Sequence, residues 1–182
     1  MDIRRVVTGH DEQGHSVFVS DELVEPIVLK SLPGSEFHRL WGSDAVVAFP
    51  DDGSRPTAER YFPPIGGFRF GYFTIPPADV TASRTDIDAE MKRAELDVEV
   101  PGLGEYLEAD HPGMHTTASI DFGVVVSGEV ILELDDKKRV TLGAGDSYVQ
   151  NGTRHRWINK GNVPAVIAVV LIGAHHEVVS EP

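Results

Sequence analysis

The fold is decided by two stretches of sequence, Gly113-Met114-His115-Thr116-Thr117-Ala118-Ser119-Ile120-Asp121 and Asn151-Gly152-Thr153-Arg154-His155-Arg156-Trp157-Ile158-Asn159. His115 and Asp121 have the same parity, so on a continuous strand both side chains point to the same face. If the strand that carries His155 is a neighbour in the sheet and its imidazole faces the same way, three metal-binding groups converge. No other constellation in the sequence is typical of a chemical site.

The sequence from Thr116 onward alternates short apolar runs with turns. The runs cover residues 124–126, 130–134, 140–142, 147–149, 155–158 and 165–172. The turns between them are rich in glycine, aspartate and lysine. Short strands at this spacing are typical of a β-sandwich or β-barrel.

The sequence before residue 113 is more mixed. Apolar runs predict a hairpin, a possible strand and two further strands, at residues 6–19, 24–29, 45–49 and 68–75. A helix is predicted from Ala82 to Ala94, because Ile87, Met91 and Ala94 have helical spacing. Thr85, followed three residues later by Asp88, resembles a capping box at its start.

Composition narrows the class of protein. The 182 residues indicate one domain, 1–182, and the absence of cysteine excludes disulfides and thiolate chemistry. The formal charge of −13 argues against nucleic acid and anionic membranes as partners. No signal-type stretch follows the N-terminus, and the longest apolar run, 163–174, is shorter than the roughly 20 residues that span a bilayer. We therefore expect a cytoplasmic protein.

The first motif resembles that of the cupin superfamily, whose small jelly-roll barrels often hold a metal. The family pattern is H-x-H, three or four residues, E, six residues, G. In this sequence His115 takes the place of the first histidine, Thr117 the second, Asp121 the glutamate and Gly128 the closing glycine.

The second motif of that family ends in G-x-x-H-x-x-x-N, which Gly152, His155 and Asn159 match. Gly145-Asp146 resembles the turn that opens it, whereas the usual proline is missing. The resemblance implies an all-β fold, a double-stranded β-helix or jelly-roll barrel with its core motifs at 113–173. Extra N-terminal strands and loops then occupy 1–80, and a short helical insertion occupies 81–110.

We expect His115, Asp121 and His155 to be metal ligands. Two neutral imidazoles and one carboxylate can bind divalent Fe, Mn, Zn, Co or Ni and leave positions open for substrate, water or dioxygen. Thr117 is too weak a donor for a dependable ligand, but it can hydrogen-bond a substrate oxygen. The structural alternative is a buried His–Asp pair with His155 packed elsewhere.

Four further side chains are candidates for substrate binding, and three of them have a structural alternative. Gln150 could face the cavity or hold the turn beside it, and Trp157 could wall the pocket or pack in the core. Arg69 could anchor an anionic substrate if its face lines the cavity. His111 could act as an acid–base group at the barrel mouth or lie at the surface.

Three functions remain open. The first is a metal-dependent enzyme that acts on a small organic molecule, with Fe(II) oxygenase chemistry preferred. The second is a non-redox metal-dependent lyase, dehydratase or isomerase, and the third is a small-molecule binding barrel that catalyses nothing. The resemblance also implies a homodimer, in which the N-terminal hairpin pairs with a second subunit.

Overall fold

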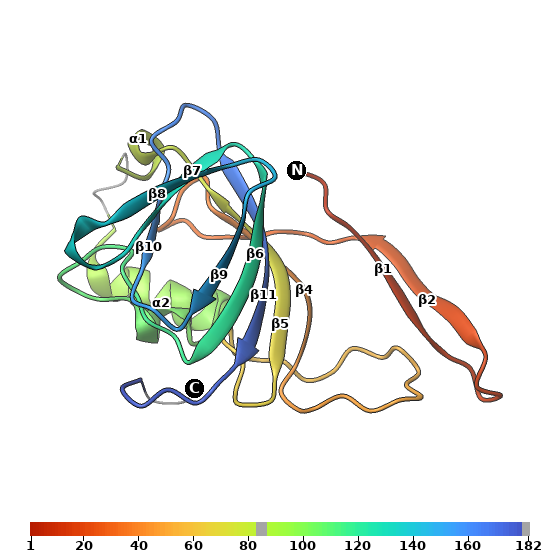
Figure 1. Cartoon of the computed structure of the whole chain (residues 1–182). Coiled ribbons are helices and arrows are strands. Elements are labelled where there is room, and N and C mark those ends of the chain that lie inside the picture. The colour runs from red at the N-terminus through yellow and green to blue at the C-terminus, as the bar shows by residue number, and fades with distance from the viewer. Residues whose placement is uncertain (83–86, 180–182) are drawn as a thin grey trace.

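The computed structural model describes residues 1–82 and 87–179 and consists mainly of antiparallel β-strands wound into a barrel (Figure 1). The strands are β1 (Arg4–His10), β2 (Ser16–Leu23), β3 (Ile27–Val28), β4 (Glu36–Ser43), β5 (Phe68–Ile75), β6 (Ser119–Ser127), β7 (Glu129–Glu133), β8 (Arg139–Gly143), β9 (Ser147–Asn151), β10 (Arg156–Ile158) and β11 (Ala165–Gly173). The helices are α1 (Ala78–Ala82) and α2 (Ala89–Glu99), with 3-10 turns η1 (Leu103–Tyr106) and η2 (Asp135–Lys137).

The barrel is built from two sheets. The larger has the strand order β3-β4-β5-β11-β6-β9, and the smaller has the order β10-β7-β8. β1 and β2 form a separate two-stranded sheet outside both. This arrangement confirms the predicted all-β jelly roll with extra N-terminal strands and a short helical insertion.

Two apolar clusters form the core. One joins the two sheets through the fully buried side chains of Val125, Val130 and Ile167. The other lies where α2 and η1 cover one end of the barrel, and includes Leu96 and Val100. Alternation along each strand directs one set of side chains into these clusters and the other set outward.

The strand predicted at 45–49 is wrong. β4, which the sequence did not indicate, ends just before it at Ser43. The Ser43 hydroxyl donates to the carbonyl oxygen of Ala45 and accepts from its backbone N–H, so the chain turns away from the sheet. Val46 and Phe49 are therefore largely exposed in a loop.

The predicted helix is present but shifted. α2 begins at Ala89, and Asp88 is its N-cap, with a carboxylate oxygen that accepts from the Met91 backbone N–H at 2.8 Å. The helix continues to Glu99, past the predicted end at Ala94. Thr85 lies outside the described residues. Of the helices in the described parts of the chain, none is long and apolar enough to cross a membrane.

Candidate functional site

Two histidines from distant parts of the chain lie side by side inside the barrel. His115 and His155 form an isolated antiparallel bridge, in which each backbone N–H donates to the other's carbonyl oxygen at 2.9 Å. Their ring centroids are 4.2 Å apart and the ring planes are inclined by 51°. His155 is 3% exposed. The structure thus brings together the two imidazoles on which the sequence-based site depends.

Both imidazoles are oriented in the same way by the backbone. The Nδ1 atom of His115 donates to the Gly113 carbonyl oxygen at 3.1 Å, and that of His155 donates to the Thr153 carbonyl oxygen at 2.9 Å. Because a carbonyl oxygen can only accept, each Nδ1 carries the proton and each Nε2 keeps its lone pair. Metal-binding histidines are held in this manner by their second nitrogen.

Burial keeps both rings uncharged. Removal from water lowers the pKa of His115 below its ordinary value. The same cause, with His115 as a neighbour, lowers the pKa of His155 to about 3. A metal ion requires neutral imidazoles, so the pair is ready to bind one without first losing protons at neutral pH.

Asp121 is the one buried carboxyl on the inward face of β6 among the described residues, at 6% exposed. The Ser119 hydroxyl donates to its Oδ1 at 2.7 Å, and the hydroxyls of Ser119 and Thr117 are 3.0 Å apart. Burial raises the pKa of Asp121 to about 6, because the single hydrogen bond from Ser119 only partly replaces water. The carboxyl can therefore hold or release a proton near neutral pH.

The three predicted ligands do not form one cluster. Within residues 1–82 and 87–179, no three histidine or acidic side chains lie close enough to hold one ion. On a continuous strand, shared parity would place His115 and Asp121 on one face but roughly 20 Å apart, because six residues of extended chain separate them. The chain is not regular strand at 116–118, and β6 begins only at Ser119. The donor set fits a metal at His115 and His155, and a third bond from Asp121 stays a prediction.

Gln150 holds the loop that carries His155. Its side-chain nitrogen donates to the carbonyl oxygen of Thr153 at 3.1 Å and to the Thr153 hydroxyl. The same carbonyl oxygen accepts from Nδ1 of His155. These bonds favour the turn-holding alternative for Gln150, and its contact with a substrate stays a prediction.

An aromatic wall adjoins the histidine pair. Trp157 lies edge-to-face with His155 at 6.0 Å between centroids and packs on Tyr148 at 4.8 Å. Tyr148 fits because its strand neighbour is Gly123, where a Cβ atom would lie 2.3 Å from the tyrosine ring. Trp157 also packs against the core cluster around Val125, which agrees with the core-packing alternative, and its contact with a substrate stays a prediction.

Two candidates lie away from the histidine pair's immediate contacts. Arg69 is buried and donates to the carbonyl oxygens of Arg60, Ser43 and Phe68, with an ion pair to Asp44. Its guanidinium is thus engaged by the protein itself. The His111 side chain is 62% exposed and lies 3.1 Å from Glu108, in keeping with the surface alternative.

Ser119 and Tyr148 are site residues that the sequence interpretation missed. Ser119 has the same parity as His115, Thr117 and Asp121, so the alternation that selected those three also selects it. Tyr148 has the same parity as Gln150 on β9. No comparable signal marks Tyr61, which is partly buried in a segment that the sequence predicts to be loop, and whose pKa is raised strongly by its removal from water.

The fold and site together define a small antiparallel barrel with an inward histidine pair. Residues 104–171 match the model of the cupin domain family, a segment that includes both histidines and Asp121. The matched segment covers less than half of the chain, so the similarity to cupin domains is established for residues 104–171.

Curated relatives come from fungi. A cupin-domain-containing oxidoreductase of Aspergillus ruber is 26% identical over 171 residues, which cover 92% of this chain and 71% of that protein. Phomopsin biosynthesis cluster protein C' of Diaporthe leptostromiformis is 49% identical over 49 residues, which cover 27% of this chain. The chain spans only about a quarter, 26%, of that relative's length.

Solved structures of cupins are similar at low identity. A predicted oxalate decarboxylase from Thermotoga maritima has 14% identity and a TM-score of 0.43, with 82% of this chain and 93% of that chain covered.

Proposed function

We propose that this protein is a metal-dependent cupin enzyme that acts on a small organic molecule. The observation that carries the proposal is the pair of neutral, adjacent imidazoles with both Nε2 atoms unprotonated. His115 and His155 would hold a divalent ion, which can be Fe, Mn, Zn, Co or Ni. Two protein ligands leave several coordination positions for substrate and water, or for a carboxylate.

Redox chemistry is the first candidate. Relatives of this chain are named cupin-domain-containing oxidoreductases, and the Fe(II) oxygenase hypothesis agrees with that name. A bound redox-active metal would supply electron transfer between substrate and dioxygen. The protein's own contribution is to keep both imidazoles neutral and oriented, and to shield the site with Trp157 and Tyr148.

Proton transfer is the second candidate, and Asp121 favours it. A carboxyl with a pKa of about 6 is populated in both protonation states near neutral pH. Its hydroxyl neighbours, Ser119 and Thr117, form a chain of hydrogen bonds that leads from the carboxyl toward the segment that follows His115. A lyase, dehydratase or isomerase needs such a group to take a proton from one substrate atom and return it to another.

The first experiment measures metal content and oxygen uptake. Protein purified without added metal is analysed by inductively coupled plasma mass spectrometry, beside His155→Ala and the half-buried control His10→Ala, far from the histidine pair in the hairpin β1–β2. We expect His155→Ala to lose at least ninety per cent of the metal while it remains folded, and His10→Ala to keep it. Stoichiometric metal in His155→Ala would remove this histidine from the site.

Oxygen uptake with a panel of small organic substrates separates the candidates. Substrate-dependent uptake supports the oxygenase. Turnover under nitrogen with zinc or manganese supports proton transfer. Ligand binding that survives removal of the metal, without turnover of any compound, supports the non-catalytic barrel and contradicts the proposal.

A further inference from the structure

Three neutral hydrogen-bond donors near the histidine pair have no partner among the described residues. They are the hydroxyls of Tyr61 and Tyr148 and the indole Nε1 of Trp157. None of the three belongs to the fully enclosed polar atoms that lack a partner in the described parts of the chain. Each is therefore open to space that a water-sized molecule can enter. Polar groups inside a protein are nearly always hydrogen-bonded, so these donors are available to a ligand.

Of the three donors, Tyr148 is the one whose position the neighbouring strand fixes. Tyr148 faces Gly123 across the pair of β6 and β9, and a Cβ atom at position 123 would lie 2.4 Å from the tyrosine hydroxyl oxygen. Gly123 thus leaves the room that the ring occupies. Asp121 is the next inward residue on β6, so the hydroxyl of Tyr148 lies over the strand that carries the site carboxyl.

Both tyrosine hydroxyls keep their protons at neutral pH and can donate. Burial raises the pKa of Tyr148, and the charges of Asp121 and Tyr61 raise it further. Burial also raises the pKa of Tyr61, although the charge of Arg39 acts in the opposite direction. Asp121 contributes to both shifts, which agrees with two hydroxyls that lie around one carboxyl.

The positive charges near these donors are already occupied. The two end nitrogens of Arg39 donate to the carbonyl oxygens of residues 58–60, and Arg69 is engaged by the protein in the same way. Among the described residues, no cation lowers the pKa of Asp121. A charged group of a substrate beside these donors would therefore be buried without a partner, which is costly.

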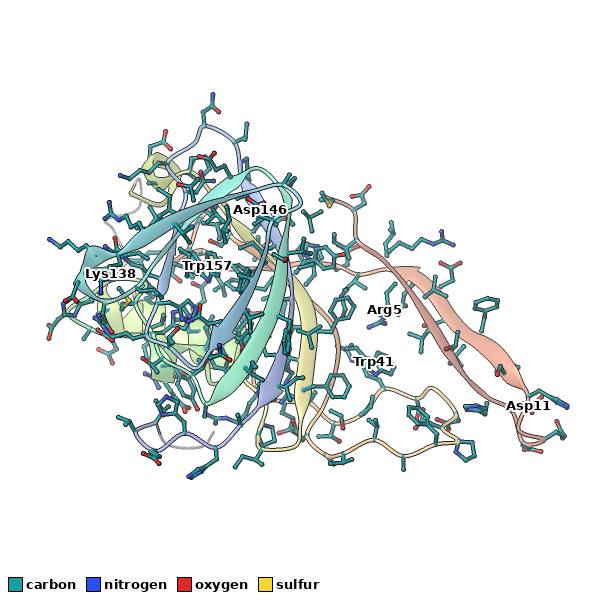
Figure 2. The ribbon with its side chains drawn as sticks, in the orientation of Figure 1. Arg5, Asp11, Trp41, Lys138, Asp146 and Trp157 are labelled. Atoms are coloured by element: carbon teal, nitrogen blue, oxygen red, sulfur yellow. The ribbon has the colours of Figure 1, made fainter. Side chains whose placement is uncertain are left out.

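Aromatic rings continue the histidine pair on both sides. The ring centroid of Phe62 is 6.5 Å from that of His115. On the other side, the ring of Trp157 is 6.0 Å from that of His155. Figure 2 shows Trp157 among the strands of the barrel, whereas Trp41 lies on the side that faces the hairpin β1–β2. Flat, unsaturated molecules pack well against such rings, by stacking or by edge contacts.

We propose that the Tyr148 hydroxyl donates a hydrogen bond to an oxygen of the substrate. The substrate is then a flat, unsaturated molecule, and the end that carries this oxygen is uncharged. The inference rests on the proposed function, because it places the substrate beside the histidine pair that would hold the metal. Tyr148 determines specificity, since an oxygen satisfies its hydroxyl whereas a hydrocarbon at the same place leaves that hydroxyl unpaired.

Two probes that differ at one carbon test the proposal. 4′-Fluoroacetophenone carries the oxygen there and 1-ethyl-4-fluorobenzene does not, and ¹⁹F NMR titration measures the binding of each to the full chain. Tyr148→Phe should weaken binding of the ketone about fivefold, as expected for one hydrogen bond, and leave binding of the hydrocarbon unchanged. Tyr72→Phe is the matched control and should change neither, because Tyr72 points away from the core that its neighbour Phe73 enters.

The tryptophans report where the probe binds. The sequence contains two, Trp41 and Trp157, so a ¹H–¹⁵N spectrum shows two indole signals, which Trp41→Phe assigns. We expect 4′-fluoroacetophenone to shift the Trp157 signal and to leave the Trp41 signal in place. A shift of the Trp41 signal alone would place the probe outside the barrel and overturn the proposal.

Gly123→Ala tests the position of the tyrosine ring by a second route. The added methyl group displaces the ring and keeps the hydroxyl, so the ketone should again bind about fivefold more weakly. Unchanged binding of the ketone in this variant contradicts the proposed contact.

Competition against 4′-fluoroacetophenone tests the class of substrate. In the presence of a chelator, acetophenone should displace this probe at about tenfold lower concentration than cyclohexyl methyl ketone or benzoate does. The first competitor lacks a flat ring, and the second buries a charge. Benzoate that competes better than acetophenone overturns the proposal.

The titrations are run on the protein as purified and again with a chelator, so their outcome is separate from that of the metal analysis. Metal content of His155→Ala tests the proposed function, and the probes test Tyr148. An equal loss of both probes in Tyr148→Phe assigns the tyrosine to packing alone and overturns the proposal. Wild-type protein that binds neither probe overturns it as well.

Discussion

Replacement of Asp121 by asparagine should make the metal-free protein more stable at neutral pH. The carboxyl is 6% exposed, and burial raises its pKa from 3.8 to about 6. The folded state therefore binds the proton more tightly than the unfolded state does. The contribution of this group to stability is fully present below about pH 4 and is lost as the pH rises through 6.

The size of the effect follows from the shift in pKa. A difference of about two units corresponds to about 3 kcal/mol at 1.36 kcal/mol per unit. Asparagine has nearly the same shape and keeps an oxygen that can accept from Ser119, but it carries no charge at any pH. We expect the stability of Asp121→Asn relative to wild type to rise between pH 4 and 6 and to level off above pH 7.

Urea unfolding from pH 4 to 8 in the presence of a chelator measures this difference. Asp110→Asn, which changes an exposed aspartate, is the matched control. Its free energy of unfolding relative to wild type should not change with pH. If the stability of Asp121→Asn relative to wild type stays constant or falls as the pH rises from 4 to 8, burial does not raise the pKa of this carboxyl. If the Asp121 carboxylate also binds the metal ion, addition of metal should reduce the difference in stability between Asp121→Asn and wild type.

Other substitutions have direct consequences. Thr117→His restores the usual four-ligand pattern and should tighten zinc binding by at least tenfold in calorimetry; an unchanged affinity argues that position 117 does not face the metal. Ser119→Ala removes the hydroxyl that donates to Asp121, so the pKa of Asp121 in a ¹³C NMR titration should rise further, and a fall contradicts the hydrogen-bond assignment. Ile167→Ala empties a fully buried position and should cost about 2–5 kcal/mol in urea unfolding, whereas Val124→Ala on the half-exposed outer face should cost less than about 1 kcal/mol.

From residue 119 onward, the alternation of apolar and polar residues and the glycine turns predict most of the strands. The runs around Val125, Val130 and Ile167 each place every second residue in the core, and the structure has strands at all of them. Strand prediction failed where a side chain of the neighbouring element redirects the chain. The Ser43 hydroxyl turns the backbone at Ala45, an effect that no periodicity in the apolar run 45–49 reveals.

The site was predictable in part. His115 and His155 are adjacent because strand pairing brings residues forty positions apart into register, and the two family motifs mark both ends of that pairing. The distance of Asp121 from the two histidines was harder to predict. Parity indicates which face of a strand a side chain lies on, but not how far along the strand it lies from another residue. Ser119 lies between Thr117 and Asp121 in the sequence and has the same parity as both. Its hydroxyl bonds to each of them, so the Asp121 carboxyl is linked to Thr117 through Ser119 and not by direct contact.

The most direct measurement of the central claim is a ¹⁵N NMR titration of the histidine side chains with zinc. The structure predicts that in the metal-free protein His115 and His155 are neutral with the proton on Nδ1. One equivalent of zinc should then move the Nε2 resonances of both residues together, while His10 and His111 stay unchanged. Nε2 resonances of His115 and His155 that do not respond to zinc, or that respond at different metal concentrations, would contradict a shared metal between these two imidazoles.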